Sequence, residues 1–243
     1  KIKKEMNLKV NGVTLKAVNY KESDKILTVF TLERGKITIS ARGVRKANAR
    51  MRGLSEPFCF AETVVAEKAG RYTAAEVNVF DCFYDIRLSL DKYYAGLCAL
   101  EFTDAFFPEE TVSEEQFTLL VEFLKKLCKS ETPKILLAEF FCSALKISGY
   151  GVSFSQCFRC GRAIADKVYF SASEGSVVCS DCAAGGDKEF SYDTYSYLKT
   201  VAEKGDISRF SPQTVTNGLK FFGHYVTTVA GVTLKCLPPL FAV

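Results

Sequence analysis

The chain has 243 residues, of which 48% are hydrophobic and 25% charged, and its formal net charge is +4 at pH 7. This length allows two or three small domains, and the composition is that of an ordinary globular protein rather than a disordered or fibrous one. No apolar run approaches about 18 residues, which argues against a membrane helix, and the N-terminus lacks the apolar stretch of a signal peptide, so we expect a cytoplasmic protein with reduced cysteines.

The charge is unevenly distributed along the chain. Residues 1–80 carry 16 lysines and arginines against 8 aspartates and glutamates, whereas residues 81–243 carry 16 against 20. A basic N-terminal third favours a module that binds a polyanion. A lysine-rich face that is simply solvated has the same signature, and charge alone does not separate the two.

The first predicted elements are five short strands, at residues 13–20, 26–32, 36–42, 61–68 and 71–80. In the third strand Ile37 and Ile39 alternate with polar residues, which is the period of a half-buried strand. Five strands within the first 80 residues suit a small closed barrel, and five is the strand number of the oligonucleotide-binding (OB) fold. The periodicity also permits an SH3-like barrel.

A basic segment connects the third and fourth strands. Its cations are Arg42, Arg45, Lys46, Arg50 and Arg52, and no acidic residue follows them until Glu56. Because five like charges repel one another unless an anion is near, we predict that this segment contacts nucleic acid. Lys16 and Lys36 are weaker candidates for the same contact, and a flexible, solvated loop is the alternative.

Beyond residue 84 the hydrophobic period becomes 3.6, which predicts helices at residues 85–107, 113–129, 132–151, 191–204 and 211–231. Ser113 and Gln116 have the spacing of a capping box at the start of the second helix. Pro133 suits the first position of the third helix, and Gly149 suits its left-handed end.

Four of the ten cysteines form two Cys-x-x-Cys pairs: Cys157, Cys160, Cys179 and Cys182. This spacing is typical of one structural zinc ion, because each pair turns two thiolates toward the same point. Four thiolates leave no position for water, so we expect no catalysis by the metal. A thioredoxin-type motif would need a βαβ setting, which the pattern lacks. The arginines and lysine of this segment, Arg159, Arg162 and Lys167, could contact either nucleic acid or solvent.

Taken together, the elements predict a multidomain α+β chain. Residues 1–82 form an OB-fold barrel, 83–152 the first part of a helical domain, 153–187 a four-cysteine zinc-binding module, and 188–243 the second part of the helical domain. No phosphate-binding loop or hydrolase motif is present. The sole histidine, His224, has no acid or nucleophile beside it in the sequence, so we expect no catalytic residues and no enzyme.

The N-terminal segment resembles that of the bacterial recombination mediator family RecO. It contains a Glu-Ser-Asp step at residues 22–24, a Phe-Thr pair at 30–31, a turn at Gly35 and a Gly-x-Arg-Lys loop at 43–46, and a Pro-Phe pair follows at 57–58. The order of barrel, helices and inserted four-cysteine module is also similar to the family's.

This resemblance implies a non-enzymatic, nucleoid-associated DNA repair protein. Such a protein binds single- and double-stranded DNA and anneals complementary strands. Its partners are the RecR protein and single-stranded DNA-binding protein (SSB), with which it helps to load RecA onto SSB-coated single strands, and it needs no membrane. The alternatives are an RNA-binding or ribosome-associated zinc protein, since OB barrels and zinc ribbons also serve RNA, and an enzyme with an unrecognised site.

Overall fold

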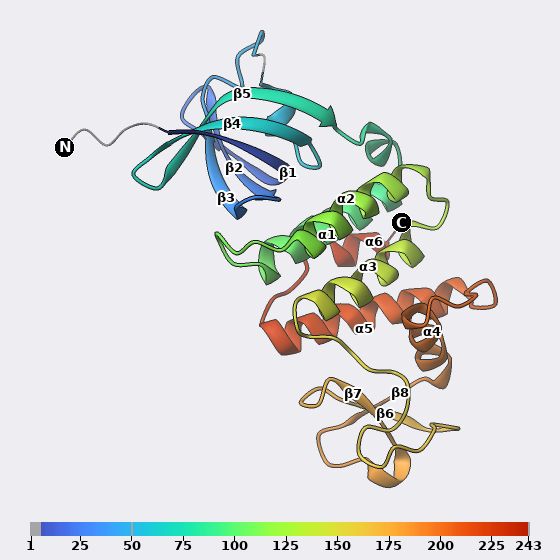
Figure 1. The fold of residues 1–243 in the computed structure, drawn as a ribbon. Helices are drawn as coiled ribbons and strands as arrows, with labels where there is room; N and C mark the ends of the chain where they lie inside the picture. The colour runs from blue at the N-terminus through green and yellow to red at the C-terminus, as the bar shows by residue number, and fades with distance from the viewer. Residues whose placement is uncertain (1–5, 50, 243) are drawn as a thin grey trace. The chain divides into compact units, whose positions relative to one another are not determined.

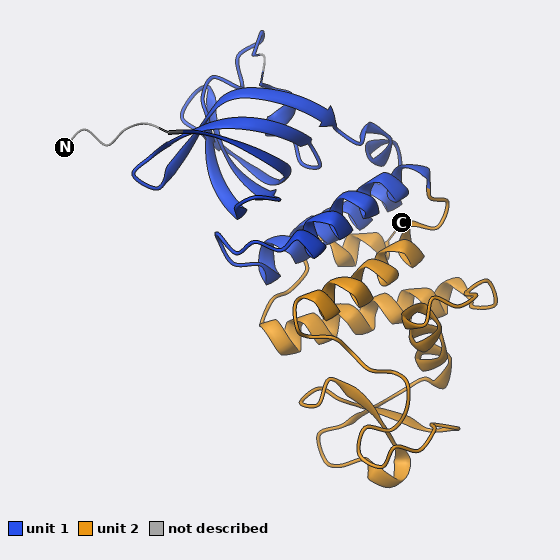
Figure 2. Cartoon of the chain, viewed as in Figure 1, with its two compact units in different colours: residues 1–129 blue, residues 130–243 orange. Residues whose placement is uncertain are grey.

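The computed structural model describes residues 6–49 and 51–242 (Figure 1). The chain divides into two compact units, residues 1–129 and 130–243 (Figure 2). The division falls between the second and third long helices, within the predicted helical domain, and the predicted domain boundaries stay a prediction.

The first unit begins with a closed five-stranded barrel. Its strands are β1 (Met6–Tyr20), β2 (Asp24–Thr31), β3 (Gly35–Ala41), β4 (Phe60–Lys68) and β5 (Arg71–Asp81). They close in the order β1-β2-β3-β5-β4, all antiparallel except the β3–β5 pair. The predicted OB-type barrel is therefore confirmed.

Alternation along the strands fills the barrel. Ile37 and Ile39 lie opposite Val29 and Leu27 across the β2–β3 pair, and all four side chains are buried. On β1 the pairing with β2 shifts register between Thr14 and Lys16. Such a bulge re-aims the side chains that follow it, and beyond it Lys16 and the last three residues of β1 are exposed.

Two helices complete the first unit, α1 (Leu90–Phe106) and α2 (Glu114–Lys129), preceded by the short 3₁₀ helix η2 (Tyr84–Leu88). The predicted helix 85–107 is thus divided, because Ser89 between η2 and α1 has an extended backbone.

The capping box at the start of α2 is half formed. The backbone N–H of Gln116 donates to the Ser113 hydroxyl (3.3 Å), as predicted. The Gln116 side chain does not return to Ser113, since its amide instead donates to the Thr103 hydroxyl (3.0 Å) on α1.

The second unit combines helices with a small sheet. Its helices are α3 (Pro133–Ile147), α4 (Tyr192–Ala202), α5 (Pro212–Ala230) and α6 (Leu237–Leu240), and its strands are β6 (Val168–Ser171), β7 (Ser176–Cys179) and β8 (Lys188–Phe190), ordered β7-β6-β8. Pro133 starts α3, and Gly149 has the positive φ of 84° expected beyond its end. Among the described residues, no helix is long and apolar enough to span a membrane.

Candidate nucleic-acid interface and metal centre

The basic segment, defined from here on as the basic loop (residues 42–52), is anchored where it leaves β3. The N–H of Gly43 donates to the Asp24 carboxylate (2.8 Å), and the N–H of Arg45 donates to the Ser23 carbonyl (3.0 Å). The hydrogen bond from Gly43 holds the pKa of Asp24 below its ordinary value. The Glu-Ser-Asp step between β1 and β2 therefore fixes the start of the basic loop.

The chain is also held just beyond the far end of the basic loop. There the short 3₁₀ helix η1 (Gly53–Ser55) receives two contacts from the barrel. The Thr14 hydroxyl of β1 donates to the Leu54 carbonyl (2.8 Å), and the Lys25 ammonium of β2 donates to the Ser55 carbonyl (3.0 Å). Strands β1 and β2 thus hold both ends of the segment that carries the cations.

Backbone hydrogen bonds also run through the basic loop. The N–H groups of Lys46, Ala49 and Arg52 each donate to the carbonyl three residues earlier, at 3.1, 3.1 and 3.2 Å. This is a run of consecutive turns with a defined path. The described residues of the basic loop therefore follow a series of hydrogen-bonded turns.

Three cations of the basic loop, Arg42, Lys46 and Arg52, are exposed, and no carboxylate of a described residue forms an ion pair with them. Arg45 is exposed too, but its guanidinium donates to the carbonyls of Lys21 and Glu22 (3.3 and 3.0 Å). These three free cations and Arg45 lie at one end of the barrel.

Arg50 lies outside the described residues. The two weaker candidates differ in their placement. Lys16 is exposed on the outer face of β1. Lys36 lies at the other end of β3 from Arg42, its ammonium contacts the Asp104 carbonyl and carboxylate (3.1 Å to Oδ1), and its side chain is only 14% exposed. The structure therefore does not bring Lys36 to the basic loop.

The sequence prediction missed an exposed aromatic residue at this end of the barrel. Tyr20, the last residue of β1, is 48% exposed. The Lys21 ammonium lies 5.3 Å from the centroid of its ring. The bulge in β1 that precedes Tyr20 is a tertiary feature, and the residue pattern carried no sign of it.

The second site is the cluster of Cys157, Cys160, Cys179 and Cys182, whose sulfur atoms all lie within 4.8 Å of one another. The Cys160 and Cys179 sulfurs are 3.8 Å apart. Zn–S bonds of about 2.3 Å in a tetrahedron place sulfurs roughly 3.8 Å apart. The donor set and its spacing therefore fit a tetrahedral, thiolate-binding metal ion.

Hydrogen-bonded turns set the backbone conformation of the first cysteine pair, Cys157 and Cys160. The N–H of Gly161 donates to the Cys157 carbonyl (2.8 Å), and the N–H of Cys157 donates to the Arg162 carbonyl (2.9 Å). Gly161 has a φ of 72°, which a residue with a side chain rarely adopts. The second pair spans the end of β7 and the 3₁₀ helix η3 (Ser180–Cys182).

The charges around the cluster also favour a metal. The Arg162 guanidinium donates to the Cys160 sulfur (3.5 Å) and lowers the pKa of that thiol to about 6. Hydrogen bonds with Cys160 and Cys179 raise the pKa of Cys182 to about 12. Neighbouring thiols cannot all ionise without a cation between them, and a bound divalent ion would supply that charge.

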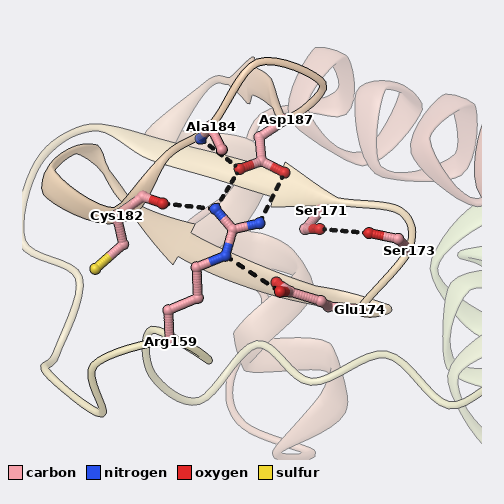
Figure 3. Close-up of polar contacts among 7 residues, drawn as sticks. All are labelled: Arg159, Ser171, Ser173, Glu174, Cys182, Ala184 and Asp187. Atoms are coloured by element: carbon pink, nitrogen blue, oxygen red, sulfur yellow. Dashed lines mark hydrogen bonds and ion pairs between the residues drawn. The ribbon is translucent and has the colours of Figure 1, made fainter.

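One arginine connects the two cysteine pairs, and Figure 3 shows its contacts with Cys182, Asp187 and Glu174. Arg159, between the cysteines of the first pair, donates to the Cys182 carbonyl (2.5 Å) in the second pair. It also donates to the carboxylates of Asp187 (2.6 Å) and Glu174 (3.2 Å). Arg162 pairs with Asp181 (2.9 Å). Both arginines thus form ion pairs within the four-cysteine module and its three-stranded sheet, defined from here on as the ribbon (residues 153–190).

Comparison with known proteins gives concordant matches in both parts of the chain. Residues 6–83 match the family model "Recombination protein O N terminal", and residues 87–238 match "Recombination protein O C terminal". The chain is 28% identical to "DNA repair protein RecO" of Caldicellulosiruptor saccharolyticus, over 87% of this chain and 86% of that protein. It is 32% identical to the protein of the same name from Desulforamulus reducens, over 79% and 76%, and 33% identical to that of an Anaeromyxobacter species, over 73% and 71%.

Proposed function

This chain belongs to the RecO family of DNA repair proteins, and from that membership we propose that it is a DNA-binding recombination mediator. In this proposal it anneals complementary single strands and helps to load RecA onto SSB-coated single-stranded DNA. Its protein partners are RecR and SSB, it acts in the cytoplasm at the nucleoid, and it catalyses no covalent reaction.

The observation that carries the proposal is the basic loop at one end of an OB-type barrel, which is anchored at both ends and exposes three cations that form no ion pair with a described residue. Anchoring matters because a loop held at its ends loses less conformational freedom when its cations bind phosphates. Arg42, Lys46 and Arg52 bind phosphates and release counterions, which requires no sequence readout. Arg45 and Lys16 extend this contact, and the exposed ring of Tyr20 offers a face on which an unpaired base can stack. Lys36 is left out of the set because it is held by Asp104.

Annealing follows from the same charges. Two complementary strands repel each other through their phosphates, and a cationic surface that binds both lowers this repulsion. Base pairing then supplies the free energy of the reaction, so that no nucleotide hydrolysis is needed. The absence of a phosphate-binding loop motif from the sequence accords with this mechanism.

The four-cysteine cluster is proposed to hold one zinc ion with a structural role. All four sulfurs act as ligands, which closes the coordination sphere and leaves the metal no substrate position. The ribbon sheet has only three short strands, so the metal would provide much of its folding free energy, on the order of 10 kcal/mol. Stripping the metal with a strong chelator should unfold the ribbon, and freshly purified protein without zinc would contradict the assignment.

A salt titration of DNA binding tests the proposed interface. The variant replaces the three unpaired cations with alanine, Arg42→Ala, Lys46→Ala and Arg52→Ala. The matched control replaces three exposed cations toward the other end of the barrel, Arg34→Ala, Lys68→Ala and Arg71→Ala. Both variants lose the same charge, so that only position distinguishes them.

For single-stranded DNA, each lost phosphate contact lowers the slope of log K against log salt by about 0.7. We expect the slope of the basic-loop variant to fall by about 2 and that of the control to stay unchanged. Equal effects in the two variants would reject the basic loop as the interface. A clear preference for structured RNA over DNA would favour the RNA-binding alternative.

A further inference from the structure

A cleft of about 590 Å³ lies in the second unit, between helix α5 and strands β6 and β8 of the ribbon sheet. Its volume is in the range of ligand-binding sites. The residues that line the cleft range from Phe170 to Thr228 and include no residue of the basic loop and none of the four cysteines.

Aromatic rings form one wall of this cleft. Phe190 and Phe221 lie nearly parallel, with centroids 5.7 Å apart and planes at 19°, and Phe221 and Tyr225 are parallel within 3° at 6.1 Å. Phe170 meets the Phe221 ring edge-on at 4.8 Å. Phe190 and Phe221 are only partly buried, so each offers apolar ring surface to a planar ligand.

Two lysines line the same cleft. Lys188 and Lys220 are exposed, and the Lys188 ammonium lies 3.4 Å from Nε2 of His224, which also lines the cleft. No acidic side chain of the described residues pairs with either lysine. The one acid in the lining is Glu189, whose carboxylate accepts a hydrogen bond from the Tyr169 hydroxyl (3.4 Å). The cleft therefore combines ring surface with two lysines and one glutamate, and so with a net positive charge.

We propose that this cleft binds one or two nucleotides of a single strand, as a second nucleic-acid site apart from the basic loop. The base lies against Phe190 and Phe221, and the phosphates contact Lys188 and Lys220. Aromatic stacking and cations are the two features by which proteins hold single strands without reading their sequence. A duplex does not fit, because its bases are stacked within the helix. The inference rests on the proposed function, since annealing requires that one protein hold two strands.

An acidic peptide is the other ligand that this chemistry could attract. An extended peptide gains affinity by pairing its backbone with the edge of a sheet. The edge strand here, β8, has only three residues and so offers few backbone groups for such pairing, and the lining of the cleft also includes the polar residues Thr194 and Asn217. These features favour a nucleotide, which needs a stacking surface and a few side-chain contacts.

Photo-crosslinking locates the bound bases directly. The probe is a short oligothymidylate that carries 5-iodouracil, mixed with the full chain in its zinc-loaded form, and the crosslinked peptides are mapped by mass spectrometry. We expect crosslinks at Phe190, Phe221 or Tyr225 in addition to crosslinks on the barrel. Crosslinks on the barrel alone would overturn the second site and leave the proposed function standing. Crosslinks in the cleft alone would support the second site and contradict the proposed DNA contact of the barrel.

Charge neutralisation gives an independent measurement. In the Arg42→Ala, Lys46→Ala, Arg52→Ala background, Lys188→Gln with Lys220→Gln should lower the salt slope of oligothymidylate binding by about 1.4, from two phosphate contacts. The matched pair Lys204→Gln with Lys235→Gln, exposed lysines outside the cleft, should leave it unchanged. Equal slopes for both pairs, or no residual binding in that background, would refute the inference. A competition experiment with a poly-aspartate peptide that carries one aromatic residue tests the peptide alternative. If this peptide binds the cleft and the oligonucleotide does not displace it, the inference is refuted.

Discussion

Replacing Arg159 with alanine should weaken metal binding by the four-cysteine cluster. Arg159 contributes no ligand, but it joins the two cysteine pairs through the Cys182 carbonyl and holds the carboxylates of Asp187 and Glu174 (Figure 3). Asp187 is only 6% exposed in its side chain, so removal of Arg159 leaves a covered carboxylate without its counter-charge. The pKa of Asp187, which Arg159 lowers, should then rise.

The expected loss follows from the number of contacts removed. Substituting a group that orients metal ligands typically weakens metal affinity about 10- to 100-fold. Arg159 makes contacts to three residues around the cluster, so we expect the Arg159→Ala protein to lie near the upper end of that range. The assay is competition for zinc against a chromophoric chelator, at fixed pH because thiolate ligands must lose protons to bind.

Arg209→Ala is the matched control for this experiment. Arg209 is an exposed arginine of the same unit whose guanidinium lies over the Phe210 ring (4.8 Å) and away from the cysteines. Its variant should bind zinc as tightly as the unaltered protein. If Arg159→Ala also retained full zinc affinity, the arginine would not position the ligands and the reasoning would fail.

Two further substitutions test packing and loop anchoring. Gly218→Ala would place a Cβ 2.6 Å from the Tyr197 ring. Overpacking costs about 1–3 kcal/mol, which outweighs the gain in helix propensity of up to about 1 kcal/mol. The midpoint of urea unfolding should therefore shift to a lower urea concentration. Gly185→Ala, with open space around it, should change stability by less than about 0.5 kcal/mol, and equal shifts for the two would disprove the packing argument. Asp24→Ala removes the acceptor for the Gly43 N–H, so trypsin should cut the basic loop faster. Because the folded pKa of Asp24 is lowered, its anchoring is present above the ordinary pKa and is lost as the pH falls through the lowered value; unchanged cleavage in the variant would show that Asp24 is no anchor.

The sequence allowed the barrel, the helices and the four-cysteine cluster to be predicted because each depends on local pattern. Alternation at Ile37 and Ile39 reflects a strand with one buried face, and the two Cys-x-x-Cys turns bring ligands together by their own geometry. Pro133 and Gly149 marked the ends of α3 for equally local reasons.

Features that depend on distant partners could not be predicted. Lys36 was expected to be available for DNA, but Asp104, 68 residues away, holds its ammonium. Gln116 was expected to complete a capping box, but Thr103 on the neighbouring helix takes its side-chain amide. Arg159 also finds its partners across the ribbon, up to 28 residues away. In each case tertiary packing supplied a partner that the neighbouring sequence does not indicate.

The annealing rate of two complementary oligonucleotides, measured without nucleotide and with or without SSB, tests the central claim most directly. We expect the unaltered protein to anneal them without ATP. The variant with Arg42→Ala, Lys46→Ala and Arg52→Ala should be slower by about tenfold or more, as expected when phosphate contacts are lost. The control with Arg34→Ala, Lys68→Ala and Arg71→Ala should match the unaltered protein. Failure of the unaltered protein to anneal, or equal rates in all three proteins, would contradict the account.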